Sequence, residues 1–153
     1  MLEKQKKKIW NKDFFILFIV NIVTSLGFQM LSPNMAAYAS SLGASTGMLG
    51  TVTASFALAA LAARPFSGKA ADQFDNKKLI LVSLIGITIS LFAYSLATSI
   101  ALVLAVRFIH GLFFGLNSTL AMTMASRTLP EENLGSGMGI FGLGLVASMT
   151  VAP

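Results

Sequence analysis

The sequence predicts an all-α membrane protein that crosses the bilayer about five times. Three observations predict this fold class: 55% of the 153 residues are apolar, only 11% are charged, and the apolar residues gather in runs of around twenty. A soluble domain is about one quarter charged, because it must cover its core with a wet surface. Runs of this length cross a bilayer as helices, since lipid offers no partner to unpaired backbone groups.

Five apolar runs follow a short basic tail, residues 1–13. The predicted spans are residues 14–38, 47–66, 79–97, 100–126 and 135–153. At about 1.5 Å rise per residue, twenty helical residues cross the roughly 30 Å hydrocarbon core. A cleavable signal peptide is the alternative for the first run, with a cleavage site at Ala37-Tyr38-Ala39. We favour a retained helix, because the run is longer than the apolar core of a signal peptide.

Basic residues alternate between present and absent on successive connections. The tail is rich in lysine, residues 67–78 contain three lysines, and the connection after the fourth span contains Arg127. The two intervening connections, residues 39–46 and 98–99, contain no charge. The positive-inside rule therefore places the N-terminus in the cytoplasm. We expect a multi-pass protein of the cell (plasma) membrane, with the lipid bilayer as its surroundings. Asp75 or Asn76 is suited to cap the third helix.

Composition also argues against several function classes. The net charge of +5 does not indicate a nucleic-acid partner, because no basic face alternates with exposed aromatic residues. Cysteine is absent and the single histidine has no carboxylate cluster near it, so we predict no metal site and no cofactor. The acidic residues Asp72, Asp75, Glu131 and Glu132 lie in connections, which argues against a membrane-embedded enzyme.

The first predicted span carries a mostly polar stripe. Its members are Asn21, Thr24, Ser25, Phe28 and Gln29, at spacings of i, i+3, i+4, i+7 and i+8. This spacing places them on one helical face. Two interpretations stay open at this point: hydrogen bonds to neighbouring helices, or the wall of a water-filled cavity.

The fourth predicted span places a charged residue inside the membrane. Arg107 is seven residues into this span, around 10 Å deep, where an arginine costs about 2.5–3.5 kcal/mol on insertion scales. His110, Gly111, Asn117 and Ser118 lie within about 80° of it on the helix. We therefore predict that Arg107 faces a cavity, with snorkelling to the interface as the alternative. His110 is interpreted either as a titrating group or as a packed hydrogen-bond partner.

Gly111 and Gly115 form a G-x-x-x-G pair, which is typical of close helix packing. The polar stripes fall on the first and fourth spans, the first member of each group of three. This is the layout expected of inverted three-helix repeats around a central site.

Residues 68–78 read GKAADQFDNKK and resemble motif A of the major facilitator superfamily, roughly G-x-L-A-D-R-x-G-R-K-K. The matching residues are Gly68, Asp72, Lys77 and Lys78. Asp75 replaces a glycine of the pattern and Asn76 an arginine, which removes a cation and adds an anion.

Two further stretches resemble motifs of the same family. Residues 107–111 are similar to motif B, R-x-x-Q-G, with His110 in place of glutamine. The fifth span is similar to motif C, G-x8-G-x3-G-P; the residues at its fixed positions are Gly139, Ser148, Ala152 and Pro153. The three motifs occur in the family's order and on the corresponding spans.

The resemblance implies a secondary transporter of small molecules that alternates between inward-open and outward-open states. It implies that motif A is a gating loop with Asp72 as its charge, and that Arg107 couples transport to protons. His110, Asn21, Gln29 and Asn117 are then the further candidates for the substrate and proton pathway. Motif C implies efflux by antiport, with Gly139 and Pro153 joining Gly111 and Gly115 in helix packing.

The family has twelve spans in two halves, whereas this sequence supplies about five. We therefore expect an N-terminal fragment whose partner is a C-terminal half, and no transport by the fragment itself. The alternative is a truncated membrane protein without transport activity, which at most assembles with a complementary half.

Overall fold

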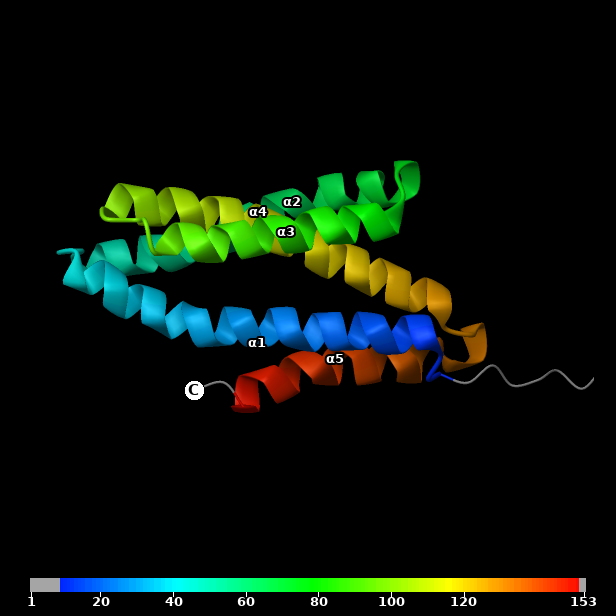
Figure 1. Ribbon diagram of the computed structural model, residues 1–153. Helices are drawn as coiled ribbons and strands as arrows, with labels where there is room; N and C mark the ends of the chain where they lie inside the picture. The colour runs from blue at the N-terminus through cyan, green and yellow to red at the C-terminus, as the bar shows by residue number, and fades with distance from the viewer. Residues whose placement is uncertain (1–8, 152–153) are drawn as a thin grey trace, which may run out of the picture.

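Five long helices joined by short connections make up residues 9–151, the part of the chain that the computed structural model describes (Figure 1). They are α1 (Lys12–Ser41), α2 (Thr46–Gln73), α3 (Asn76–Tyr94), α4 (Ile100–Thr128) and α5 (Leu134–Val151), with a 3-10 turn, η1 (Glu131–Asn133), before α5. Successive helices run in opposite directions. Most of the predicted tail and the predicted packing residue Pro153 lie outside the described residues.

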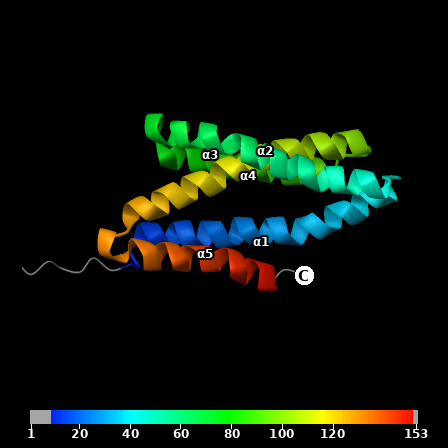
Figure 2. The ribbon, with the colours of Figure 1, turned by 180° about the vertical axis from the view of Figure 1, so that it is seen from behind.

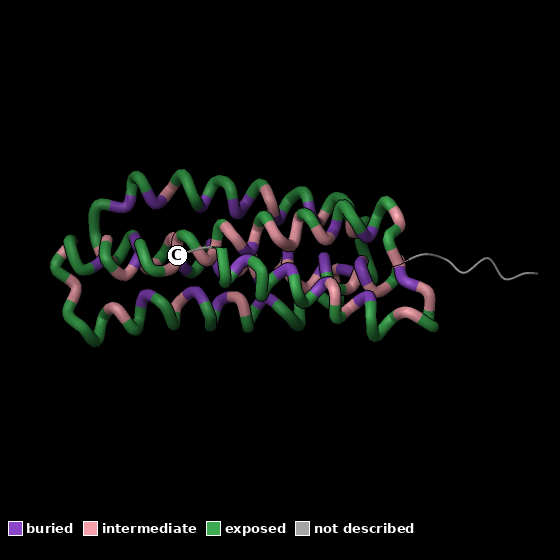
Figure 3. The backbone as a smooth tube through the Cα atoms, turned by 90° about the horizontal axis from the view of Figure 1, so that it is seen from below, coloured by how far each residue is buried: buried purple, intermediate pink, exposed green. Residues whose placement is uncertain are grey.

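All five helices are long and apolar enough to cross a membrane, and residues 9–151 contain no strand. The predicted fold class, an all-α multi-pass membrane protein, is thus confirmed. Large apolar side chains cover the outside: Phe66, Phe92 and Leu96 are 73%, 73% and 76% exposed. Figure 3 shows exposed positions along the outer sides of the helices. Lipid is the surrounding that suits such a surface.

The second and third helices are longer at their shared connection than the sequence predicts. The predicted second span ends at residue 66, but α2 continues through Pro65 to Gln73, and α3 begins at Asn76. The extension packs Ser67 and Ala71, which are buried, so a buried face outweighs the single backbone hydrogen bond that proline removes. The predicted gating loop is therefore two helix ends joined by residues 74–75.

Three local features shape α1. Asn11 caps its start, because the Asn11 side chain accepts a hydrogen bond of 2.8 Å from Phe14 N. Pro33 lies inside the helix, and Figure 1 shows α1 bending towards its cyan end. After Ser41 the chain turns at Gly43, whose φ of +86° is the left-handed conformation that glycine adopts at helix ends.

The helices form two groups that α4 connects. Figures 1 and 2 show α1 beside α5 on one side, while α2 and α3 on the other side both pack on α4, which crosses between the groups. The most extensive helix pair is α2 with α4. Alanine and glycine line this seam, and Ala59, Ala63, Gly111 and Gly115 are buried there. Small residues let helix backbones approach closely in a membrane.

Within residues 9–151, the connections that carry charge all lie at one end of the bundle. Asp13, Asp72, Lys77, Arg127 and Glu131 all lie near helix ends on this side, which we call the charged end. The connections at the opposite end, residues 42–45 and 95–99, contain no charged residue. The charged end is therefore the one to which the sequence assigns the basic connections.

The buried interior is apolar towards both ends and polar between them. One apolar cluster, near the charged end, includes Phe14, Leu120 and Phe141. The other, near the opposite end, consists of Ala39, Val52, Ala97 and Val103. The buried polar layer between the two clusters contains Ser25, Ser83, Ser90, Arg107, His110, Asn117 and Ser148. This layer is where a functional site is expected.

Candidate functional site

Arg107 lies in the interior of the bundle, third turn of α4, and is only 1% exposed. Its Nη2 donates a hydrogen bond of 3.4 Å to the backbone carbonyl of Ser32 on α1. Its Cζ lies 5.5 Å from the ring centroid of Phe56 and 6.0 Å from that of Tyr94. Desolvated cation–π contacts contribute about 2 kcal/mol, which offsets part of the cost of burying the charge. Arg107 Nε and Nη1 have no hydrogen-bond acceptor among the described residues.

His110 lies one turn further along α4 and is also 1% exposed. Its Nδ1 is 3.1 Å from the Tyr94 hydroxyl at the end of α3, and its ring meets those of Phe56 and Phe114 edge-on. Arg107, His110, Tyr94 and Phe56 thus form one contact group, which we call the Arg107 cluster. Three helices contribute to it.

A small cavity of about 160 Å³ reaches the Arg107 cluster from the side of α1 and α3. It is lined by Val23, Thr24, Gly27, Phe28, Leu84, Ile87, Thr88, Leu91 and His110. Thr24 and Phe28 belong to the polar stripe predicted on the first span. The Phe28 ring also stacks on Phe56 at 4.6 Å, so this stripe borders the cluster.

Close packing of α2 on α4 holds Phe56 over the cluster. A Cβ added at Gly111 would meet the Phe56 carbonyl oxygen and would lie 2.9 Å from Ala59 Cβ. A Cβ at Gly115 would meet the Ala60 carbonyl oxygen and would lie 2.8 Å from Ala60 Cα. Both glycines therefore occupy positions that exclude a side chain unless α2 moves away.

The other three members of the predicted pathway lie outside the Arg107 cluster. Asn117 is buried two turns beyond His110, where its Oδ1 accepts a hydrogen bond of 3.1 Å from Ser83 on α3. Asn21 donates from Nδ2 to the backbone carbonyl of Phe141 on α5, at 3.1 Å. Gln29 is half-buried on α1. The Asn21 bond is an interhelical hydrogen bond of the kind that was one of the two interpretations of the polar stripe.

Arg107 itself lines no open space among the described residues. We expected its helical face to line an open space, but Arg107 is covered by residues of α1, α2 and α3. The face that Arg107 shares with His110 and Gly111 lies inside the five-helix bundle, because that is the face on which α2 and α3 pack. Helical spacing identified the shared face correctly but not its surroundings.

The motif A residues form a second site at the charged end. Asp72 is in the last turn of α2, and its Oδ1 accepts a hydrogen bond of 3.0 Å from Arg127 Nη2 on α4. Asp75 caps α3, as predicted, by accepting hydrogen bonds from the backbone N–H groups of Lys77 and Lys78 at 2.9 and 3.4 Å. The side chains of these two lysines are exposed. Gly68 is exposed on α2, with open space beside it.

Gly139, for which the sequence predicts a packing role, has no packing partner among the described residues. Gly139 is exposed, and a Cβ there would have no atom within 4 Å. Gly144 contacts α1 instead: a Cβ there would lie 3.1 Å from Ile22 Cγ1, and nearby Ser148 donates to the Ile22 carbonyl at 3.3 Å. The sequence signal was the spacing of small residues at 137, 144 and 148, which follows a heptad-like stripe.

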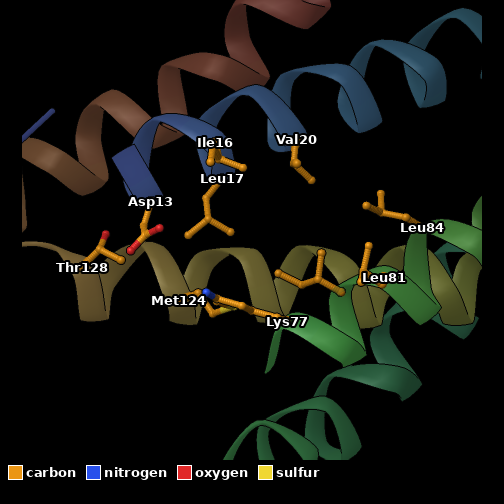
Figure 4. A pocket seen from close by; sticks show the side chains of 10 residues that line it. Asp13, Ile16, Leu17, Val20, Lys77, Leu81, Leu84, Met124 and Thr128 are labelled. Carbon is orange, nitrogen blue, oxygen red and sulfur yellow. The ribbon is translucent and has the colours of Figure 1, made fainter. Parts of the chain in front are cut away.

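A larger pocket of about 380 Å³ lies between α1, α3 and α4 near the charged end (Figure 4). Its lining residues are Asp13, Ile16, Leu17, Val20, Lys77, Ile80, Leu81, Leu84, Met124 and Thr128. Asp13 and Thr128 mark one end of it, and Val20 and Leu84 mark the other. The lining is mostly aliphatic, and none of the pathway residues predicted from the sequence belongs to it.

A family model described as "Major Facilitator Superfamily" matches residues 17–153. The chain belongs to the Major Facilitator Superfamily. An uncharacterized MFS-type transporter of Methanocaldococcus jannaschii is 29% identical over 142 residues, which are 93% of this chain and 37% of that relative. The staphyloferrin B transporter of Staphylococcus aureus is 28% identical over 152 residues, 96% of this chain and 36% of the relative. The quinolone resistance protein NorA of the same species is 29% identical over 106 residues, 69% of this chain and 27% of the relative.

The chain thus spans a little over a third of the length of the first two relatives. Membership in the Major Facilitator Superfamily, expected from the three motifs, is confirmed. Motif B of the superfamily falls on the Arg107 cluster, and motif A falls on the helix ends around Asp72.

The sequence of this Major Facilitator Superfamily chain did not reveal three residues that contact the predicted site residues Arg107, His110 and Asp72. Tyr94 and Phe56 hold Arg107 and His110, yet each reads as an ordinary apolar position of its own helix. Arg127 was interpreted only as a topogenic charge. Signals for Tyr94 were weak but present, because the chain has just two tyrosines and this one lies near the end of an otherwise aliphatic span.

Proposed function

We propose that this chain belongs to the N-terminal half of a proton-coupled transporter that exports a small molecule across the cell membrane. One observation carries the proposal: a buried guanidinium, Arg107, at membrane depth, paired with aromatic faces and one carbonyl rather than with a carboxylate. Ionisable groups at such depth are expensive to insert and mark substrate or proton pathways.

The distribution of acidic residues adds to the proposal. The six acidic residues of the sequence lie at Glu3, Asp13, Asp72, Asp75, Glu131 and Glu132, all in the tail or near helix ends at the charged end. No carboxylate therefore stands in the middle of a span. We propose that the carboxylate that exchanges protons comes from a C-terminal half, and that Arg107 stabilises its ionised form electrostatically.

The names of the relatives support transport as the activity. One relative is a staphyloferrin B transporter and another is a quinolone resistance protein, which fits export of a small molecule. The motif C resemblance of α5 favours antiport over uptake. The charged end fits the cytoplasmic side, because its connections carry the basic residues.

The test uses everted membrane vesicles that contain the protein encoded by this chain together with the adjoining downstream sequence. A fluorescent quinolone serves as the first probe, with other fluorescent drugs after it, and both probe uptake and dissipation of the proton gradient are followed. We expect Arg107→Ala to abolish proton-driven uptake without lowering the amount of inserted protein. Arg64→Ala, which removes an exposed arginine of α2, is the matched control and should leave uptake unchanged.

Unchanged proton-driven uptake in Arg107→Ala vesicles would refute the role of Arg107. The alternative, a membrane protein without transport activity, is favoured if the adjoining sequence encodes no further spans. Seven further spans are expected if the proposal is correct.

A further inference from the structure

Asp72 is placed where its own helix does not stabilise it. The residue is in the last turn of α2, and the C-terminal end of a helix carries a partial negative charge that disfavours a carboxylate. That last turn contains no basic residue, and the Asp72 side chain is 72% exposed. A cation from another part of the chain is needed to hold this carboxylate in a fixed orientation.

The neighbouring residues do not provide that cation. The motif A pattern has arginines directly after the aspartate and four positions after it, whereas this chain has Gln73 and Asn76. The nearby Asp75 is an anion and does not bind Asp72; its carboxylate caps α3. Lys69 lies one turn before Asp72, but the ion pair that Asp72 makes is with a residue far along the chain.

That residue is Arg127, in the last turn of α4. Its Nη2 lies 3.0 Å from Asp72 Oδ1, and a cation is favourable at the C-terminal end of α4. The neighbours of the pair fix its geometry: Ala71 is 4% exposed, Ala125 is fully buried, and both belong to the same apolar cluster. The two helix ends are thus held in register by the packed seam of α2 and α4.

We propose that Arg127 is the positioning residue for Asp72, and that it replaces the cations which motif A carries at the positions of Gln73 and Asn76. The ends of α2 and α4 then form one charged unit, and α4 rather than the connection after Asp72 orients the motif aspartate. Because both side chains are exposed, the pair contributes orientation more than stability. The pairing is independent of the proposed function; only its importance for gating rests on that function.

Residues 1–153 contain no cysteine, so a cysteine introduced at position 72 is the one thiol in this part of the protein, and the Asp72 parent without it gives the background reaction of any other thiol. The experiment compares the rates at which Asp72→Cys reacts with an anionic and a cationic methanethiosulfonate, in membranes containing the full protein at low salt. A positive charge about 4 Å away changes each rate by about fivefold in water, in opposite directions. We expect the ratio of anionic to cationic rates to fall at least fivefold when Arg127→Ala is added, and to be retained in Arg127→Lys.

Lys69→Ala is the matched control, because it removes another exposed cation one turn away. A ratio that Arg127→Ala leaves unchanged, or that Lys69→Ala lowers by as much, would overturn the proposal. The reversed design covers the case in which Asp72→Cys fails to insert. A thiol at Arg127→Cys should favour the cationic reagent, and Asp72→Asn should remove that preference; no change would again overturn it. Neither measurement depends on transport, so failure of the proposed function leaves this result interpretable.

Discussion

The seam between α2 and α4 predicts that a single methyl group at Gly115 destabilises the bundle. A Cβ at this position would lie 2.8 Å from Ala60 Cα and 3.0 Å from Ala60 C, and it would also meet the Ala60 carbonyl oxygen. Carbon atoms pack at about 3.5 Å or more, so the α2 backbone would have to move by at least about 0.7 Å. Overpacking of this kind costs about 1–3 kcal/mol, and the better helix propensity of alanine offsets up to about 1 kcal/mol. We therefore expect Gly115→Ala to lower the free energy of unfolding by about 1–2 kcal/mol.

The measurement is SDS-induced unfolding in mixed micelles, followed by circular dichroism and by the fluorescence of the single tryptophan, Trp10. Gly139→Ala on α5 is the matched control, because a Cβ there has no neighbour within 4 Å. This control should be neutral or stabilising by up to about 1 kcal/mol. If Gly115→Ala unfolds at the same SDS fraction as Gly139→Ala, the two backbones are not in close contact and the reasoning is refuted.

Two further predictions concern hydrogen bonds. Tyr94→Phe removes the hydroxyl that contacts His110 Nδ1 and leaves this buried nitrogen unpaired. We therefore expect the free energy of unfolding to fall by about 1 kcal/mol in the same assay. A variant as stable as the native chain would show that this bond contributes nothing. Asp75→Ala removes the cap of α3 and is expected to cost about 1 kcal/mol, whereas Asp75→Asn keeps an acceptor and should cost less. Equal losses in these two variants would argue against capping.

The features that the sequence predicted correctly depend on local chemistry. Hydropathy alone identified five spans, because the length and composition of a run decide whether lipid can surround it. The cap at Asp75 followed from its position before an apolar run. The error at the end of α2 has a local cause too, since the apolar run ends at Phe66, whereas a buried face continues the helix to Gln73.

The features that the sequence did not predict depend on contacts between helices. A spacing of 100° per residue tells which side chains share a face, but not which helix covers that face. Asn21 and Asn117 were therefore assigned to one pathway, although the first contacts α5 and the second contacts α3. Gly139 matched a motif position, yet the packing that glycine allows occurs at Gly144.

Close packing and a buried cation are two aspects of one arrangement in this bundle. Gly111 lets the backbone of α2 approach α4 at Phe56, and the ring of Phe56 is one of the two aromatic faces over Arg107. A side chain at Gly111 would displace the Phe56 carbonyl and the residue that carries it, which would withdraw part of the stabilisation of the buried charge. The arginine and the glycine of motif B are therefore physically coupled: the small residue creates the space in which an aromatic residue of another helix stabilises a buried cation. It follows that the packing role of Gly111 also shapes the surroundings of Arg107.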